Sequence, residues 1–252
     1  MHILELREVR KHFGGIKAVD DLSLAIEPNK VFGLIGPNGA GKTTVFNLIT
    51  GFLRPDEGGI LFKGEEIHRI PPHKIVKLGI CRSYQELRLF NRLRVIDNVY
   101  LGFPGQKYDS MLTALWGKRF EKSKERRENL EKASSLLRLS NLLDKKDILA
   151  ESLSFGEQKF LMVDRILATG AELILLDEPT SGLDAGQIED VLSIIKALIR
   201  DGKTVFVVEH NIDVIMSISD YIFVLDQGKK VAEGKPREIH QNEKVLQTYL
   251  GE

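Results

Sequence analysis

The stretch that decides the fold is GPNGAGKT at residues 36–43, which matches the pattern G-x-x-x-x-G-K-[ST]. An apolar run at residues 31–35 precedes it and the helix-like sequence TTVFNLIT follows, so we predict a buried strand, a loop and a helix in succession. Glycines let backbone N–H groups turn inward around phosphates, and a helix N-terminus presents its positive end to the same anion. This context predicts a phosphate-binding loop rather than a glycine turn that matches the pattern by chance.

The side chains of this loop suit a nucleotide bound together with magnesium. Lys42 can reach the β- and γ-phosphates, and the Thr43 hydroxyl can ligate Mg²⁺. We predict that ATP is contacted by the loop and by the threonine after it, that is by Gly36, Pro37, Asn38, Gly39, Ala40, Gly41, Lys42, Thr43 and Thr44.

Composition narrows the class of protein. The chain has 252 residues, of which 42% are hydrophobic and 29% are charged, as expected of a folded α/β protein. Its 36 basic and 36 acidic residues balance, which disfavours a nucleic-acid partner.

Cys81 is the single cysteine, and the charged start MHILELREVR lacks the apolar segment of a signal peptide, so we expect a reducing cytoplasm. The longest apolar runs are shorter than the roughly 20 residues that cross a bilayer. We therefore expect any membrane role to involve a partner.

The distribution of apolar residues predicts one domain, 1–252, with an inserted helical part. Residues 1–30 alternate as antiparallel strands do, and residues 71–151 are mostly helical by spacing, with a charged stretch typical of a solvated helix face. Strands and helices then alternate, which predicts a mainly parallel sheet. The core spans about residues 1–85 and 160–252, and the helical subdomain about residues 86–159. In the second part of the core we predict strands at 173–177, 204–210 and 221–226, with a helix at about 185–200 and another helix before the last strand.

Two acids end the apolar run LILLDE. Asp177 should reach the magnesium, through water, and Glu178 points the other way, where it can polarise the water that attacks the γ-phosphate. Such acids are often only a solvated strand end, but here a glycine-containing loop at residues 179–184 follows instead of a plain turn. His210 ends the next apolar strand, on the same sheet edge, and could contact the γ-phosphate. By themselves, His210 and Gln85 would be unremarkable surface residues.

Five segments together resemble the ATP-binding cassette (ABC) family: GPNGAGKT, the Gln85 loop, LSFGEQ at residues 153–158, LILLDEP with SGLD, and His210. Their order and spacing match across nearly the whole chain, and LSFGE is the discriminating segment. The resemblance implies a P-loop NTPase cassette with an N-terminal antiparallel β subdomain and an inserted helical subdomain. It also implies that ATP lies between two subunits, with the phosphate loop of one facing the signature of the other.

Several roles follow from this resemblance alone. Phe13 would stack on adenine, Gln85 would sense magnesium and the attacking water, and Asp184 would link the two sites across the dimer. Phe155 stands where glycine is usual and Glu157 where glutamine is usual, but Ser154 and Gly156 remain to contact the γ-phosphate. The catalytic set is Glu178, His210 and Gln85; the metal set is Thr43, Gln85 and Asp177; and the signature acting in trans is Ser154, Phe155, Gly156 and Glu157.

Finer features look like the branched-chain amino-acid importers of the family. They are RSYQELRLFNRLRVIDNV, the insert around Trp116 and the ending VLQTYLGE. The implied partners are transmembrane permease subunits, a second cassette that is identical or related, and an external solute-binding protein, on the cytoplasmic face of the inner membrane. Residues 86–94 would dock on the permease, although their leucines and Phe90 could equally be core residues. Alternatives are a cassette for urea or lipopolysaccharide, a soluble cassette ATPase acting on DNA or ribosomes, and a P-loop kinase.

Overall fold

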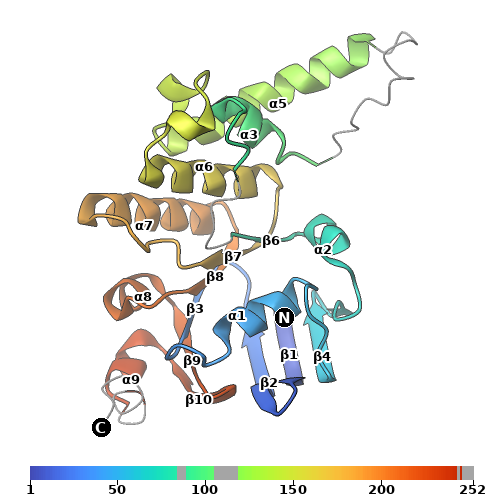
Figure 1. Cartoon of the computed structure of the whole chain (residues 1–252), viewed down its shortest axis with the longest axis vertical. Helices are drawn as coiled ribbons and strands as arrows, with labels where there is room; N and C mark the ends of the chain where they lie inside the picture. Colours follow the sequence, from blue (N-terminus) through green and yellow to red (C-terminus); the bar gives the residue numbers. More distant parts are fainter. Residues whose placement is uncertain (84–88, 105–118, 243–244, 246–252) are drawn as a thin grey trace. The chain divides into compact units, whose positions relative to one another are not determined.

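The computed structural model describes residues 1–83, 89–104, 119–242 and 245 (Figure 1). Side chains are not described for residues 119–124. The chain divides into two compact units, the first made of Met1–Gln85 with Glu172–Glu252 and the second of Glu86–Ala171. No helix among the described residues combines the length and the apolar character needed to cross a membrane.

The first unit contains an antiparallel sheet in the order β2-β1-β4-β5. Leu4 pairs with Ile26 across β1 and β2, and the alternating apolar side chains of these strands turn one face inward, which confirms the antiparallel strands predicted for residues 1–30. The strands are β1 (Leu4–Phe13), β2 (Ile16–Ile26), β4 (Glu57–Phe62) and β5 (Glu65–Glu66).

The second sheet of this unit has the order β10-β9-β3-β8-β7-β6. All its pairs are parallel except β9 with β10, so the mainly parallel prediction is confirmed. Every residue of β3, β7 and β8 is buried, which explains their continuous apolar sequences. The strands are β3 (Val31–Ile35), β6 (Ile80–Arg82), β7 (Leu173–Asp177), β8 (Thr204–Val208), β9 (Tyr221–Asp226) and β10 (Lys229–Gly234).

β6 is a short strand within residues 71–151, the region predicted to be mostly helical, and the other described elements of that region are helices. Three residues are too few for a strand period to be distinguished from a helical one. Pairing with β7 through Cys81 and Ile174 makes this short segment a strand. The helices of the first unit are α1 (Lys42–Ile49), α2 (Pro72–Leu78), α7 (Ala185–Arg200), α8 (Ile212–Ile218) and α9 (Pro236–His240).

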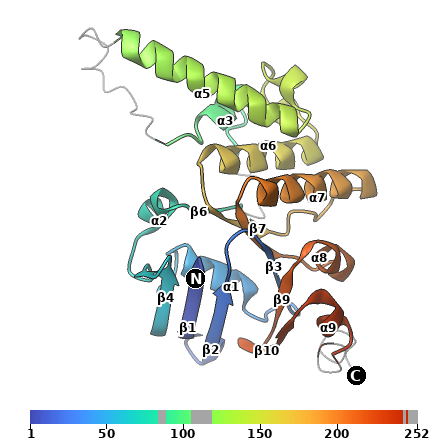
Figure 2. The same ribbon diagram turned by 180° about the vertical axis from the view of Figure 1, so that it is seen from behind.

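The second unit is helical, and Figure 2 shows α3, α5 and α6 packed side by side. The predicted boundary at residue 159 falls inside α6, and the unit extends to Ala171 because α6 packs on α3 and α5. The elements among its described residues are α3 (Val95–Tyr100), α5 (Arg119–Leu139), η1 (Leu143–Lys145), η2 (Ala150–Ser152) and α6 (Phe155–Ala168).

Candidate nucleotide-binding site

Three neighbouring parallel strands bring the phosphate loop, the two predicted acids and His210 to one edge of the sheet. β8 lies between β3 and β7, and all three run in the same direction. The phosphate loop follows β3, Asp177 ends β7 and Glu178 follows it directly, and His210 lies two residues beyond β8. Because the carboxyl ends of parallel strands meet at one edge, these groups face a common space.

The loop fits tightly against the neighbouring backbone, which explains two of its glycines. A Cβ atom on Gly36 would lie 2.1 Å from the Leu225 carbonyl oxygen, and one on Gly41 would lie 2.3 Å from that of Ala18. Gly41 also has φ +104°, a conformation that side chains disfavour. Helix α1 begins directly after it, with no side-chain cap from the described residues and no acid in its first turn. Its first N–H groups are therefore available to an anion.

Lys42 is held over the loop that precedes it. Its Nζ donates to the carbonyl oxygens of Gly36 (2.7 Å) and Pro37 (2.9 Å), and the residue is only 6% exposed. Burial lowers the pKa of Lys42, while the carboxylates of Glu178 and Asp177 act in the opposite direction. The ammonium group is thus placed between the loop and the acids.

Asp177 has one carboxylate oxygen occupied and one open. Arg82 Nη2 donates to Oδ2 at 2.5 Å, and the Asp177 N–H donates to Ser83 Oγ at 2.9 Å. Oδ1 is buried and has no hydrogen-bond partner among the described residues. Hard cations such as Mg²⁺ bind oxygen ligands, and Asp177 Oδ1 is an oxygen that can serve as one, directly or through water. The exposed Thr43 hydroxyl offers a second oxygen ligand. The described residues contain no group of three His, Cys, Asp or Glu side chains that would hold a metal without phosphates.

Glu178 and His210 meet across the ends of β7 and β8. His210 Nε2 lies 2.7 Å from Glu178 Oε1, although the two residues are 32 positions apart. Glu178 has φ +49°, and its N–H donates to the Val208 carbonyl at 2.9 Å, so the chain turns sharply just after the buried strand. The turn directs the carboxylate toward the imidazole, whose tautomer decides which group donates.

Glu209 is a site residue that sequence reasoning missed. It is 3% exposed, and its Oε1 accepts hydrogen bonds from both the N–H and the hydroxyl of Thr180, each at 2.7 Å. Its Oε2 accepts from the His210 N–H at 3.3 Å. Through these hydrogen bonds, the Glu209 carboxylate links the loop after Glu178 to the segment that carries His210. The signal in the sequence that could have identified Glu209 is its position directly after the apolar run at residues 204–208.

The remaining predicted residues of this unit have mixed placements. Asp184 is the N-cap of α7, where its side chain accepts from the Gln187 N–H at 2.9 Å. Phe13 ends β1 and is 46% exposed, with Lys11 Nζ 5.6 Å from its ring centre. Gln85 lies outside the described residues, so its predicted role stays a prediction.

The signature segment lies at the start of α6 in the second unit. Ser154 and Glu157 form a capping box, in which the Ser154 N–H donates to Glu157 Oε2 at 2.9 Å and Ser154 Oγ accepts from the Glu157 N–H at 3.4 Å. Lys145 Nζ donates to Glu157 Oε1 at 2.5 Å. Burial acts to raise the pKa of Glu157, but the hydrogen bonds from Lys145 and Ser154 hold that pKa below its ordinary value. Gly156 is buried, whereas Phe155 is 53% exposed.

A buried carboxyl lies further along the same helix. Asp164 is 1% exposed, its Oδ2 is hydrogen-bonded to Ser140 Oγ at 2.6 Å, and its Oδ1 has no partner within the described part of the chain. Burial raises the pKa of Asp164 to about 8, against the effect of Ser140. The side chain is therefore protonated in the folded protein at neutral pH.

This protonation predicts a pH-dependent stability. Between pH 4 and 8 the folded state keeps a proton that the unfolded chain releases, so Asp164 makes the free energy of unfolding fall as pH rises, by at most about 1.4 kcal/mol per unit. The substitution Asp164→Asn removes this pH-dependent loss of stability. Its free energy of unfolding in urea, minus that of the natural protein, should therefore increase from pH 5 to pH 8. An exposed control, Asp190→Asn, should show a constant difference. A pH-independent difference for Asp164→Asn would contradict the assignment.

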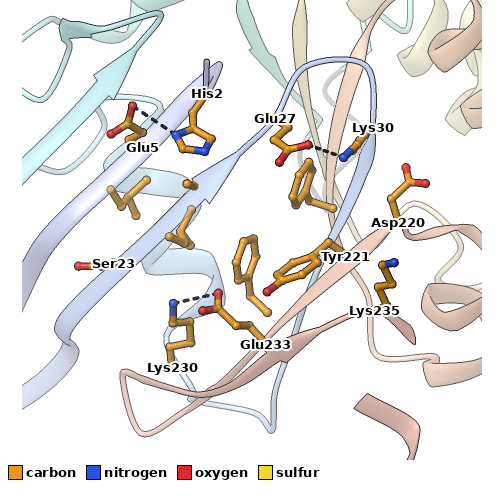
Figure 3. Close-up of a pocket in the computed structure, with 15 residues that line it drawn as sticks. His2, Glu5, Ser23, Glu27, Lys30, Asp220, Tyr221, Lys230, Glu233 and Lys235 are labelled. Carbon is orange, nitrogen blue, oxygen red and sulfur yellow. Dashed lines mark hydrogen bonds and ion pairs between the residues drawn. The ribbon is translucent and has the colours of Figure 1, made fainter. Parts of the chain in front are cut away.

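A cavity of about 510 Å³ lies at the opposite end of the parallel strands (Figure 3). Phe32 and Tyr221, at the starts of β3 and β9, contribute to its wall. Two ion pairs lie around it, Lys30 with Glu27 and Lys230 with Glu233 (2.9 Å). Its position separates it from the phosphate loop, and it is not part of the nucleotide site.

A phosphate-binding loop between a buried strand and a helix, with acids at the end of a nearby parallel strand, defines the class of P-loop nucleotide-binding proteins. A sequence model of the ABC transporter family matches residues 19–181, and the chain belongs to that family. The predicted family is thereby confirmed.

Two relatives match over almost their whole length. The high-affinity branched-chain amino acid transport ATP-binding protein BraF of Pseudomonas aeruginosa is 38% identical, over 99% of this chain and 98% of the relative. The high-affinity branched-chain amino acid transport ATP-binding protein LivG of Escherichia coli is 34% identical, also over 99% and 98%.

Solved structures confirm the predicted fold. A nucleotide-free ATP-binding cassette from an ABC transporter superposes with a TM-score of 0.86 at 32% identity, covering all of both chains. A dimeric cassette in a post-hydrolysis state, bound to ADP and phosphate, gives a TM-score of 0.77 at 27% identity over 93% of this chain and 99% of that one.

Proposed function

We propose that this chain is the ATP-binding and ATP-hydrolysing subunit of an ABC transporter that imports branched-chain amino acids. The observation that carries the ATPase assignment is the Glu178–His210 pair, 2.7 Å apart, on the sheet edge that also holds Lys42 and the phosphate loop. The solute assignment is supported by the full-length similarity to BraF and LivG.

Each group of the first unit has a role in this proposal. The N–H groups at the start of α1 and the Lys42 ammonium bind the β- and γ-phosphates. Thr43 and Asp177 hold Mg²⁺, which neutralises phosphate charge when bound. Glu178 accepts a proton from the attacking water, and His210 orients Glu178 and contacts the γ-phosphate. The products are ADP and inorganic phosphate. Gln85 is proposed to contact the magnesium and the water, from outside the described residues.

A second cassette completes each site. The Ser154 hydroxyl is only an acceptor in its capping box, so its proton remains available to donate to a γ-phosphate. The Gly156 N–H in the first turn of α6 offers a second donor. Asp184 would then lie at the dimer interface, and the exposed ring of Phe13 would stack on adenine. The dimeric post-hydrolysis cassette, which is bound to ADP and phosphate, supports the pairing of two cassettes.

The chain is proposed to act at the cytoplasmic face of the membrane, bound peripherally to permease subunits. The segment 86–94 is the proposed docking surface; residues 86–88 lie outside the described part of the chain, and Phe90, which is 47% exposed, belongs to the described part. Closure of two cassettes around ATP and their opening after hydrolysis would drive the permease between its two states. An external solute-binding protein would deliver the amino acid.

The test is capture of the transporter from detergent-solubilised membranes with this chain as bait, followed by reconstitution in lipid vesicles. We expect membrane permease subunits to co-purify and, when the solute-binding protein is also supplied, the vesicles to take up labelled leucine, isoleucine and valine only with ATP. Uptake of urea instead would place the cassette in another branch. Recovery without any membrane protein would support a soluble cassette ATPase.

A further inference from the structure

Arg82, the last residue of the edge strand β6, is a buried cation beside the metal-facing acid. Its side chain is 4% exposed, and its two terminal nitrogens point to different elements. Nη2 donates to Asp177 Oδ2 at 2.5 Å, and Nη1 donates to Asn47 Oδ1 at 2.6 Å. The guanidinium carbon lies 5.3 Å from the centre of the Phe46 ring. The planar group is thus fixed by two hydrogen bonds and an aromatic face.

The bond to Asp177 selects which carboxylate oxygen remains open. Arg82 occupies Oδ2, and Oδ1 has no hydrogen-bond partner among the described residues. The next residue, Ser83, accepts from the Asp177 N–H at 2.9 Å, so β6 fixes both the backbone and the side chain of this acid. The rotamer of Asp177 is therefore set before any ligand arrives.

The bond to Asn47 connects the same guanidinium to the helix of the phosphate loop. Asn47 follows Thr43 by four residues on α1, and residues at this spacing share one helix face. Arg82 consequently joins the α1 face that bears the Thr43 hydroxyl to the carboxylate of Asp177. These are the two side chains that would provide oxygen donors for Mg²⁺ in the proposed function.

We propose that Arg82 is a positioning residue for the magnesium site, which fixes the spacing between the Thr43 hydroxyl and Asp177 Oδ1. This inference rests on the proposed binding of Mg²⁺ and ATP. The role needs an arginine, because a lysine ammonium lacks the planar fork that binds two acceptors in fixed directions. Residues that orient a metal ligand typically change metal affinity about 10–100-fold when replaced.

The experiment compares binding of a fluorescent ATP analogue in EDTA with binding at increasing Mg²⁺ for the natural protein and for Arg82→Lys. The lysine keeps a positive charge beside the buried carboxylate, so that charge is not left unpaired. For Arg82→Lys, we expect the affinity for the analogue in EDTA to stay within about twofold of that of the natural protein. The Mg²⁺ concentration that produces half of the Mg²⁺-dependent change in affinity, the half-effect Mg²⁺ concentration, should rise about tenfold.

Two further variants separate positioning from simple stabilisation. Asn47→Ala cuts only the link to α1 without changing charge, and it should raise the half-effect Mg²⁺ concentration by about threefold or more. Lys63→Gln removes the exposed Lys63–Glu172 ion pair (2.6 Å) and should leave that concentration unchanged. If Arg82→Lys does not fold, Asn47→Ala decides the question.

The outcomes are distinct. If Arg82→Lys and Asn47→Ala shift the unfolding midpoint but leave the half-effect Mg²⁺ concentration within twofold, Arg82 is only a structural ion pair and the inference is overturned. If the natural protein binds no ATP analogue, the proposed function fails instead. Normal binding by the natural protein in EDTA with a shifted Mg²⁺ response in both variants supports the inference.

Discussion

The substitution Glu178→Gln is expected to reduce ATP turnover at least about 100-fold while leaving ATP binding intact, because a positioned general base contributes about 10²–10⁴ in rate. Glutamine keeps the shape of the side chain and can still hydrogen-bond His210, which lies 2.7 Å from the carboxylate. It cannot accept a proton from water. Phosphate release and equilibrium ATP binding, measured on the same preparation, test this expectation.

A second readout follows from the proposed pairing of cassettes. Without hydrolysis, two copies of the Glu178→Gln protein should remain closed around ATP, so size-exclusion chromatography should show an ATP-dependent dimer. Glu172→Gln provides the control, because Glu172 is exposed and pairs with Lys63 away from the site. That variant should hydrolyse ATP at the natural rate. If Glu178→Gln hydrolyses ATP within about threefold of the natural rate, Glu178 is not the general base, because general-base effects are much larger than this.

Elements with a local sequence signal could be predicted from the chain alone. The strand–loop–helix around the phosphate loop was predicted from an apolar run, a glycine pattern and a helical spacing that lie within 20 consecutive residues. The helix predicted at about 185–200 matches α7 (Ala185–Arg200), since Asp184 and Gln187 cap its start and apolar residues recur on one face. The mainly parallel character of the second sheet was predicted from the alternation of strands and helices, whereas its strand order was not predicted.

Interactions between distant residues could not be predicted in this way. Arg82 and Asp177 are 95 positions apart, and no periodicity links them. The same holds for Glu209, which follows β8 and accepts hydrogen bonds from Thr180, in the loop after β7. These bonds form only because β7 and β8 are neighbours in the sheet. The departure at Glu157 is explained by Lys145, twelve residues earlier, which neutralises a carboxylate where an amide is usual in the family. Such pairs are determined by tertiary packing.

Gly41→Ala is expected to damage the phosphate loop strongly, through both a close contact and backbone strain. The added methyl group would lie 2.3 Å from the Ala18 carbonyl oxygen on β2, and the residue would have to keep φ +104°. The loop cannot move away easily, because the Gly228 N–H donates to the Ala40 carbonyl at 3.0 Å and links the loop to the turn between β9 and β10. Backbone strain of about 1–2 kcal/mol and overpacking of about 1–3 kcal/mol should together lower the free energy of unfolding by about 2–5 kcal/mol.

Gly39→Ala is the matched control for this prediction. Gly39 also has positive φ, +83°, but nothing lies within 4 Å of its added Cβ atom, so only the strain of about 1–2 kcal/mol applies. Urea unfolding without nucleotide compares the two variants free of any effect on phosphate binding. If both lose the same stability, backbone strain alone explains the glycines. If Gly41→Ala loses clearly more, the close contact with β2 is what requires glycine, and the same contact holds the first N–H groups of α1 in place for the phosphates.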